Sequence, residues 1–138
     1  MVKLDDYRER EFVKVCNLAL EDFVNDTTGV KNVMLATVDG FTVAHCNVSE
    51  SGDQLAAVGS SIFALGATLA SEFKFGACKS ITLENEEGRV YILTIVQDDK
   101  QLILLVQSFP NSTLAMILHG AQKLSDHIKE ALQKVGQK

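Results

Sequence analysis

Basic residues, proline and tryptophan are scarce in this sequence. Its 138 residues include no tryptophan, one proline, and 13 lysines and arginines against 18 aspartates and glutamates, for a formal net charge of −5. An acidic chain without a basic cluster is a poor ligand for nucleic acid or for an anionic membrane. No run approaches the roughly 20 apolar residues that cross a bilayer, and residues 1–6 lack the apolar core of a signal peptide. We therefore expect a cytoplasmic protein whose partners include neither nucleic acid nor membrane.

Groups that could carry chemistry are few and scattered. The cysteines are an odd number in a chain without an export signal, which predicts reduced thiols; they are Cys16, Cys46 and Cys78. His119 and His127 stand eight residues apart, beyond the i, i+4 spacing that shares one face of a helix. Neither phosphate-binding signature, G-x-x-x-x-G-K-[ST] or G-x-G-x-x-G, occurs. The sequence therefore predicts no metal, no cofactor and no catalytic activity.

Hydrophobic periodicity predicts three helices and five strands. Apolar residues at intervals of three and four indicate amphipathic helices, whereas short apolar runs bounded by turn residues indicate strands. The Asp39-Gly40 pair indicates a hairpin, and Asn111 or Ser112 is the expected cap of the last helix. One domain over residues 1–138 accommodates all of these elements. In chain order they are helix 5–24, strands 32–38 and 41–46, helix 54–73, strands 80–84, 89–96 and 101–107, and helix 114–135.

The strand patterns also predict the order of the sheet. Strands 32–38, 89–96 and 101–107 are continuously apolar, as is typical of strands covered on both faces. Strands 41–46 and 80–84 carry more polar residues and therefore suit the edges. Short connections make hairpins of strands 1 and 2, 3 and 4, and 4 and 5, which leads to the order 2-1-5-4-3. We expect an α/β fold with an antiparallel-type sheet, a three-layer α-β-α sandwich with one helix on one face and two on the other.

Helix 54–73 is apolar nearly all round, with Glu72 as its only charged residue. One seam carries the large aliphatic residues Leu55, Val58, Ile62, Leu65 and Leu69. A second seam carries small residues around one phenylalanine, namely Ala56, Gly59, Ser60, Phe63, Gly66, Ala67 and Ala70. A helix of this kind is covered on more than one side. The small seam either packs closely on the sheet of its own chain or meets a second helix across a dyad.

The order of helix, Asp-Gly hairpin, small-residue helix, three-strand meander and helix resembles the roadblock / dynein-light-chain superfamily. The resemblance covers residues 12–132. Its matching stretches are Gly29-Val30-Lys31-Asn32-Val33 before Asp39-Gly40-Phe41, then Leu55-Ala56-Ala57, and Asn111. The resemblance implies a homodimer, or a heterodimer with a paralogue, paired through the middle helix and the neighbouring edge strand. It also implies a non-catalytic regulator or scaffold for a small Ras-like GTPase or for a motor or signalling complex.

With this resemblance counted, we interpret the small seam and the edge strand as the dimer interface. The predicted interface residues are Ala56, Gly59, Ser60, Phe63, Gly66, Ala67, Ala70 and Ile81. The alternative is a small-ligand sensor domain of profilin-like or PAS-like architecture. No convergent polar group interrupts the apolar strands, which disfavours a ligand held against the sheet.

Overall fold

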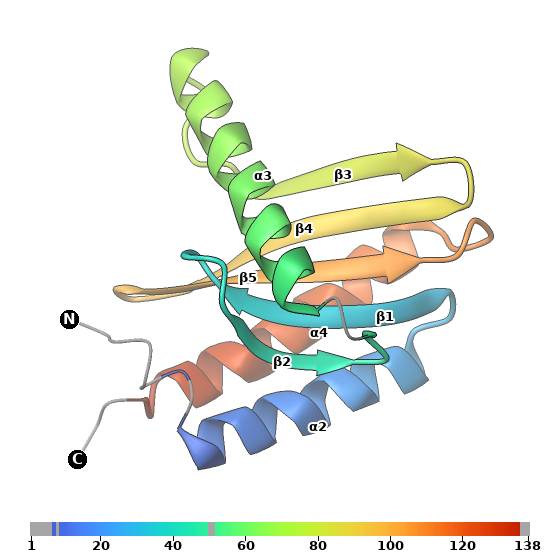
Figure 1. Cartoon of the computed structure of the whole chain (residues 1–138), viewed down its shortest axis with the longest axis vertical. Helices are drawn as coiled ribbons and strands as arrows, with labels where there is room; N and C mark the ends of the chain where they lie inside the picture. Colours follow the sequence, from blue (N-terminus) through green and yellow to red (C-terminus); the bar gives the residue numbers. More distant parts are fainter. Residues whose placement is uncertain (1–6, 8, 50–51, 136–138) are drawn as a thin grey trace.

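Five antiparallel strands form the middle layer of the protein, in the order β2-β1-β5-β4-β3 (Figure 1). The computed structural model describes residues 7, 9–49 and 52–135. The elements are α2 (Arg10–Asp26), β1 (Val30–Thr37), β2 (Thr42–Cys46), α3 (Gly52–Glu72), β3 (Ser80–Asn85), β4 (Gly88–Gln97), β5 (Lys100–Ser108) and α4 (Leu114–Leu132). The predicted strand order is confirmed. The first predicted helix corresponds to α2, and residues 5, 6 and 8 of that prediction lie outside the described part.

Helices cover the two faces of the sheet unequally. α2 and α4 pack on one face, whereas α3 crosses the other face alone (Figure 1). The larger core lies between the sheet and the helix pair. There, alternate side chains of the strands pack against α2 and α4. Among its fully buried members are Leu20 of α2, Leu35 of β1, Tyr91 of β4, Leu104 of β5 and Ile117 of α4. The predicted three-layer sandwich, with one helix on one face and two on the other, is confirmed.

The lone helix α3 covers only part of its face of the sheet. Two small clusters hold it there, one around Met34 and Ala56 and the other around Phe63, Ile92 and Ile103. Its C-terminal half continues past β3, the edge strand, and projects beyond the sheet (Figure 1). An element that overhangs its own sheet has surfaces that its own chain does not cover.

Two glycines fix the turns beside the helices. The predicted Asp39-Gly40 hairpin is confirmed, with Gly40 at φ +94° donating from its N–H to the carbonyl of Thr37 at 3.0 Å. A Cβ at Gly40 would lie 3.0 Å from the Cα of Ala57, so the turn and α3 approach closely. Gly29 also has a positive φ, +93°, and only glycine adopts this conformation readily.

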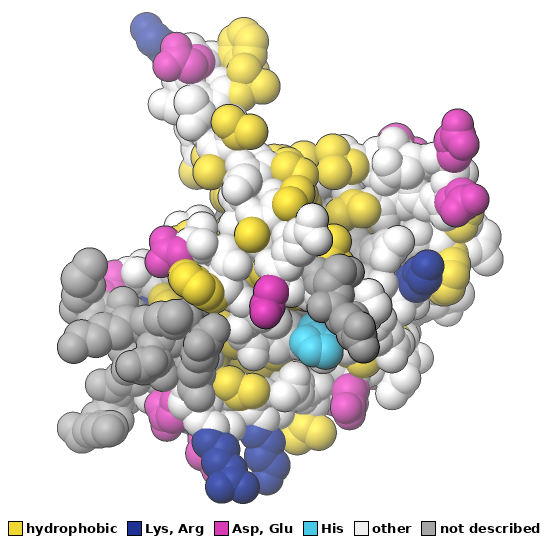
Figure 2. Space-filling model, in the orientation of Figure 1, with side chains coloured by type: hydrophobic (Ala, Val, Ile, Leu, Met, Phe, Trp, Pro, Cys, Tyr) yellow, Lys and Arg dark blue, Asp and Glu magenta, His cyan; other side chains and the backbone are white. Residues whose placement is uncertain are grey.

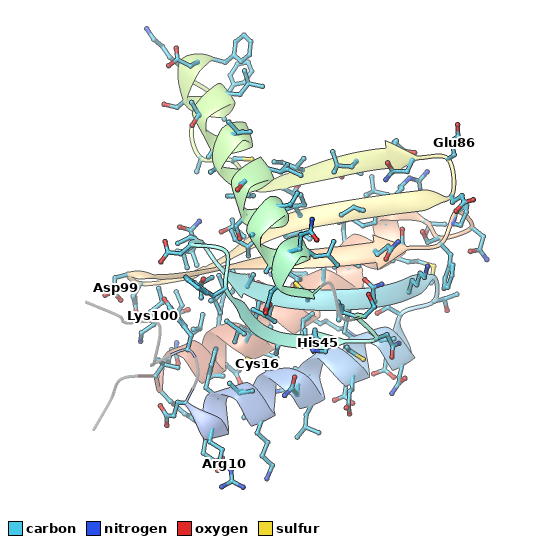
Figure 3. The ribbon with its side chains drawn as sticks, viewed as in Figure 1. Arg10, Cys16, His45, Glu86, Asp99 and Lys100 are labelled. Atoms are coloured by element: carbon cyan, nitrogen blue, oxygen red, sulfur yellow. The ribbon has the colours of Figure 1, made fainter. Side chains whose placement is uncertain are left out.

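The two ends of α4 are satisfied by different residues. Thr113 is the N-cap, and its Oγ1 accepts from the N–H of Met116 at 3.4 Å. The expected cap was Asn111 or Ser112; Ser112 instead donates its hydroxyl to the carbonyl of Phe109 at 2.7 Å and so belongs to the preceding turn. At the other end, the Nζ of Lys100 donates to the carbonyl of Leu132 at 2.8 Å, and Lys100 is only 9% exposed (Figure 3). A cation there offsets the negative end of the helix dipole.

Candidate functional site: the outer flank of α3

The small seam of α3 faces the sheet of its own chain. Ala56, Gly59, Ser60 and Phe63 are all buried. A Cβ at Gly59 would lie 2.1 Å from the Cδ2 of Leu105, so the helix backbone sits directly on β5. The hydroxyl of Ser60 donates to the carbonyl of Thr37 at 2.9 Å. For these four residues, the structure corresponds to the first interpretation of the small seam, close packing within one chain.

The other four predicted interface residues lie at the margin of this contact. Gly66, Ala67, Ala70 and Ile81 are half-buried. A Cβ at Gly66 would lie 2.5 Å from the Cδ1 of Ile81, so the structure does bring these two residues together. They meet within one chain, where α3 passes over the edge strand.

The large aliphatic seam of α3 points away from the core. Leu65 is 71% exposed and Leu69 is 59% exposed, and Leu55 and Val58 are each about half exposed. Only Ile62 of this seam is half-buried, packed against the smaller cluster around Phe63. The sequence identifies this seam, but the predicted interface did not include it. Side-chain size alone did not decide this, because small residues allow a helix to lie close either on a sheet or on another helix.

Apolar side chains continue from this seam onto the neighbouring strands. Leu83 of β3 is exposed and Val90 of β4 is half-buried, and the two are paired across the strands. Figure 2 shows hydrophobic side chains along one flank of α3 and over the adjoining part of β3 and β4. We call this surface the α3 ledge; it comprises Leu55, Val58, Ile62, Leu65, Leu69, Leu83 and Val90. Contiguous apolar surface of this kind marks interaction sites on soluble domains.

No strand of the part that the structure describes pairs with the outer side of β3, the edge strand beside the α3 ledge. Its six residues pair with β4 in a regular register from Ser80 opposite Leu93 to Asn85 opposite Gly88. Alternate residues of an edge strand direct unpaired N–H and C=O groups outward. Proline and bulges, which commonly blunt such edges, are absent from β3. The edge can therefore accept another strand.

Two aromatic side chains stand at the free end of α3. Phe73 is 62% exposed and Phe75 is 81% exposed, with ring centroids 5.7 Å apart and nearly parallel. The helix ends in a Schellman-type turn, in which Phe75 donates to the carbonyl of Ala70 and Lys74 donates to that of Ser71, both at 3.0 Å. Lys74 has φ +59°, the left-handed conformation that glycine usually supplies at this position. The turn presents the aromatic pair beyond the sheet edge.

By length and composition, α3 is also the one helix among the described residues that could cross a membrane. An 18-residue window of α3 has a mean hydropathy of 1.4, and 22% of that window is buried inside the protein. Its apolar character is divided between the small seam on the sheet and the aliphatic α3 ledge.

The cysteines do not converge in the described part of the chain, whereas His119 and His127 line one groove between α2 and α4. Cys46 belongs to β2 and Cys78 precedes β3, at opposite edges of the sheet. No group of three or more histidine, cysteine, aspartate or glutamate side chains is placed to hold a metal ion among the described residues. Burial raises the pKa of Cys16 to about 12 and also raises the pKa of Cys46, which lies near Glu21. Cys16 and His45 lie on different elements (Figure 3).

Arg89 is held in place by its neighbours. Its Nε forms an ion pair with Glu84 across the β3–β4 hairpin, and its Nη1 donates to the carbonyl of Ser112 at 3.2 Å. The hydrogen bond to Glu84 raises the pKa of Arg89 above its ordinary value. Arg89 therefore serves the fold, and it is not extended toward solvent as an arginine finger is.

Comparisons with known proteins give one family model and several solved structures of similar fold. Residues 17–108 match the family model of the Roadblock/LC7 domain. MglB of Myxococcus xanthus has a similar structure, with a TM-score of 0.82 and 17% identity over 100% of this chain and 98% of that one. A Roadblock/LC7 domain from Streptomyces avermitilis gives 0.78 and 17%, covering 85% and 97%. The gliding protein MglB of Thermus thermophilus gives 0.77 and 15%, covering 90% and 93%. No curated protein sequence matches the chain.

Proposed function

The chain belongs to the Roadblock/LC7 family, and from that premise we propose that it is a cytoplasmic, non-catalytic module that pairs with a second copy of itself, or with a paralogue, and binds a small Ras-like GTPase as its regulator or scaffold. The observation that carries the proposal is the α3 ledge beside the open edge of β3. An apolar flank and an unpaired strand edge lie side by side, and a single chain covers neither.

A two-fold axis at β3 accounts for both features. Antiparallel pairing of β3 with its copy would join two sheets into one and satisfy the outward backbone groups. Because α3 projects past β3 (Figure 1), the same axis would place the overhanging half of each helix above the sheet of the other chain. The two α3 ledges would then face each other, with Leu65 and Leu69 between the helices. A helix of 21 residues and a strand of six are large enough to supply the area of a stable interface, about 800 Å² per partner.

The proposed interface differs from the one predicted from the sequence in which flank of α3 it uses. Ile81 stays at the interface because it belongs to the edge strand β3. Gly66 lies next to it, on the side of α3 that faces β3. The four buried residues of the small seam hold α3 against its own sheet and would not contact the partner.

A GTPase partner follows from the family resemblance and suits the surface that pairing creates. Two joined sheets with two α3 helices offer a wide composite face, and the chain contributes acidic turns at 86–87 and 98–99 around it. A net charge of −5 favours a partner with a basic patch, mainly through the association rate. MglB, to which the chain is structurally similar, is described in one case as a gliding protein and in another as a tetrameric arrangement.

The test is binding to the Ras-like GTPase that co-purifies with the protein from native cells. We expect light scattering to return twice the chain mass for the protein alone, and the affinity for the GTPase to differ between its GTP and GDP forms, because only differential binding shifts a switch. The double variant Leu65→Glu, Leu69→Glu should lose both dimerisation and GTPase binding. A monomer mass across micromolar concentrations would refute the dimer. Equal affinity for both nucleotide forms would refute regulation.

A further inference from the structure

A groove on the other face of the sheet lies between α4 and the outer end of β4. Its volume is about 350 Å³. Its apolar floor comes from the strands and from Leu118 of α4, which is partly exposed. The lining also includes residues at the start of β3 and along α4, notably Lys79, Ser80, Leu93, Gln122 and Lys129.

The groove carries a local positive charge in an acidic protein. Lys79 and Lys129 line it, and no carboxylate of the described residues does. The other grooves described on the surface each include at least one aspartate or glutamate. Asp126 of α4 accepts a hydrogen bond from the Nε2 of Gln122 at 3.0 Å but does not line the groove. With a net charge of −5 on the whole chain, two lysines without a lining acid form a distinct local environment.

The floor of the groove borders an unpaired strand edge. The pairing of β3 with β4 ends at Ser80 opposite Leu93, whereas β4 continues to Gln97. Within the described ranges 9–49 and 52–135, residues 94–97 pair with β5 on one side only. Alternate residues of this stretch therefore direct N–H and C=O groups toward the open side. Thr94 and Ile95 both border the groove.

From these features we propose that the groove binds an extended acidic segment of another protein, which adds as a short strand to β4 at residues 94–97. The backbone of the segment would bond to the open edge, as in other cases of strand addition. Its side chains alternate between two faces, so the set directed into the groove would carry the carboxylates, which reach Lys79 and Lys129 while their aliphatic stems lie on Leu93 and Leu118. The site goes beyond the proposed dimer and GTPase functions, because it uses the α4 face and not the α3 ledge.

A synthetic peptide tests the proposal directly. The probe is a fluorescein-labelled peptide of about eight residues that alternates glutamate and valine, the length of an ordinary strand. Its control has the same length with glutamine in place of glutamate. We expect the acidic peptide to bind to the full chain by fluorescence anisotropy, at least about tenfold more tightly than the neutral one, and more weakly as salt rises. Amide shifts in NMR spectra should concentrate at Lys79, Leu93, Thr94 and Leu118.

Charge reversal distinguishes peptide binding in this groove from non-specific electrostatic attraction to the protein surface. The variant Lys79→Glu, Lys129→Glu should weaken peptide binding at least about tenfold, whereas Lys14→Glu, Lys123→Glu carries the same charge change elsewhere and should leave it nearly unchanged. A peptide with N-methylated alternate amides, prepared in both registers, should lose affinity in the register whose amides face β4.

Four outcomes would overturn the proposal. They are equal binding of acidic and neutral peptides, equal loss in the two charge-reversed variants, unchanged affinity after N-methylation in both registers, and anisotropy that shows no binding at millimolar protein. A fall from dimer to monomer mass on adding peptide would also refute it, because the groove would then belong to the dimer contact. Binding of the protein to anionic phospholipid vesicles through Lys79 and Lys129, without peptide binding, would assign the groove to a lipid surface instead.

Discussion

Replacing Leu65 and Leu69 of the α3 ledge by glutamate should separate the dimer without unfolding the chain. Both side chains are mostly exposed in one chain and would be covered by the partner helix. Glutamate is a good helix former, so α3 itself should tolerate both changes. A glutamate facing its own copy across the dyad adds repulsion between like charges to the lost apolar contact.

The expected magnitude follows from the exposed fractions. Complete burial of a leucine side chain stabilises by about 1.5–3 kcal/mol. Leu65 is 71% exposed and Leu69 59% exposed, so covering each should contribute roughly 1 kcal/mol or more. The proposed two-fold axis would place four such leucines in the interface, for a total of about 4 kcal/mol. The dissociation constant should therefore rise at least about a thousandfold.

Sedimentation and thermal unfolding, measured over a range of concentrations, decide the outcome. The wild-type melting temperature should rise with protein concentration, because dimerisation stabilises the folded state by mass action, and that of the variant should not. The matched control is Ser61→Glu, Thr68→Glu, which adds two charges to exposed positions outside the α3 ledge. If the leucine variant keeps the wild-type dimer mass, or if the control dissociates equally, the α3 ledge is not the interface.

Three further outcomes are expected from the fold itself. Lys100→Met keeps most of the side-chain volume but removes the cation bonded to the Leu132 carbonyl, and should lower the free energy of unfolding in urea by about 1–2 kcal/mol; an unchanged midpoint would contradict this role. Lys74→Gly relieves the left-handed conformation at φ +59° and should raise stability by about 1 kcal/mol, seen as a higher melting temperature. Burial raises the pKa of Cys16 from 9.0 to about 12, so the folded state keeps a proton that the unfolded chain releases. That stability is present below pH 9.0 and should be lost toward pH 12, by about 1.4 kcal/mol per pH unit. In Cys16→Ala the pH slope should be smaller.

The sheet was predictable because connection lengths and apolar patterns constrain it together. Three hairpins and two polar edge strands allow one order of five strands, and the structure has that order. The local detail of β2 was not predictable in the same way. Leu35 and Ala36 of β1 pair with Ala44 and Thr42, so Val43 is an extra residue in β2. Val43 and Ala44 are both buried in the core under the helix pair although they are consecutive. Strict alternation would have placed them on opposite faces of the sheet.

The orientation of α3 was beyond what periodicity alone determines. Period 3.6 identifies two seams but does not say which one meets the sheet. Small residues permit close approach to a sheet as readily as to another helix, and a lone Phe63 is compatible with both. Only the positions of Leu105 and Thr37 in space decide it, because these residues come from strands distant in sequence and contact Gly59 and Ser60. The cap of α4 shows the same limit on a smaller scale, since Asn111, Ser112 and Thr113 are all suitable N-caps.

The aromatic pair at the end of α3 bears on how long a single chain survives in the cell. Phe73 and Phe75 are largely exposed at the end of α3, where they resemble the exposed apolar segments that chaperones and proteases recognise on incomplete proteins. An unassembled chain should therefore be cleared faster than an assembled one, although its fold is intact. If the natural pair is a heterodimer, the scarcer paralogue would then set the steady-state abundance of both chains. An excess of one chain caused by unequal gene dosage would be removed after translation. We expect overexpression of this chain alone to shorten its own half-life, and co-expression of its proper partner to restore it.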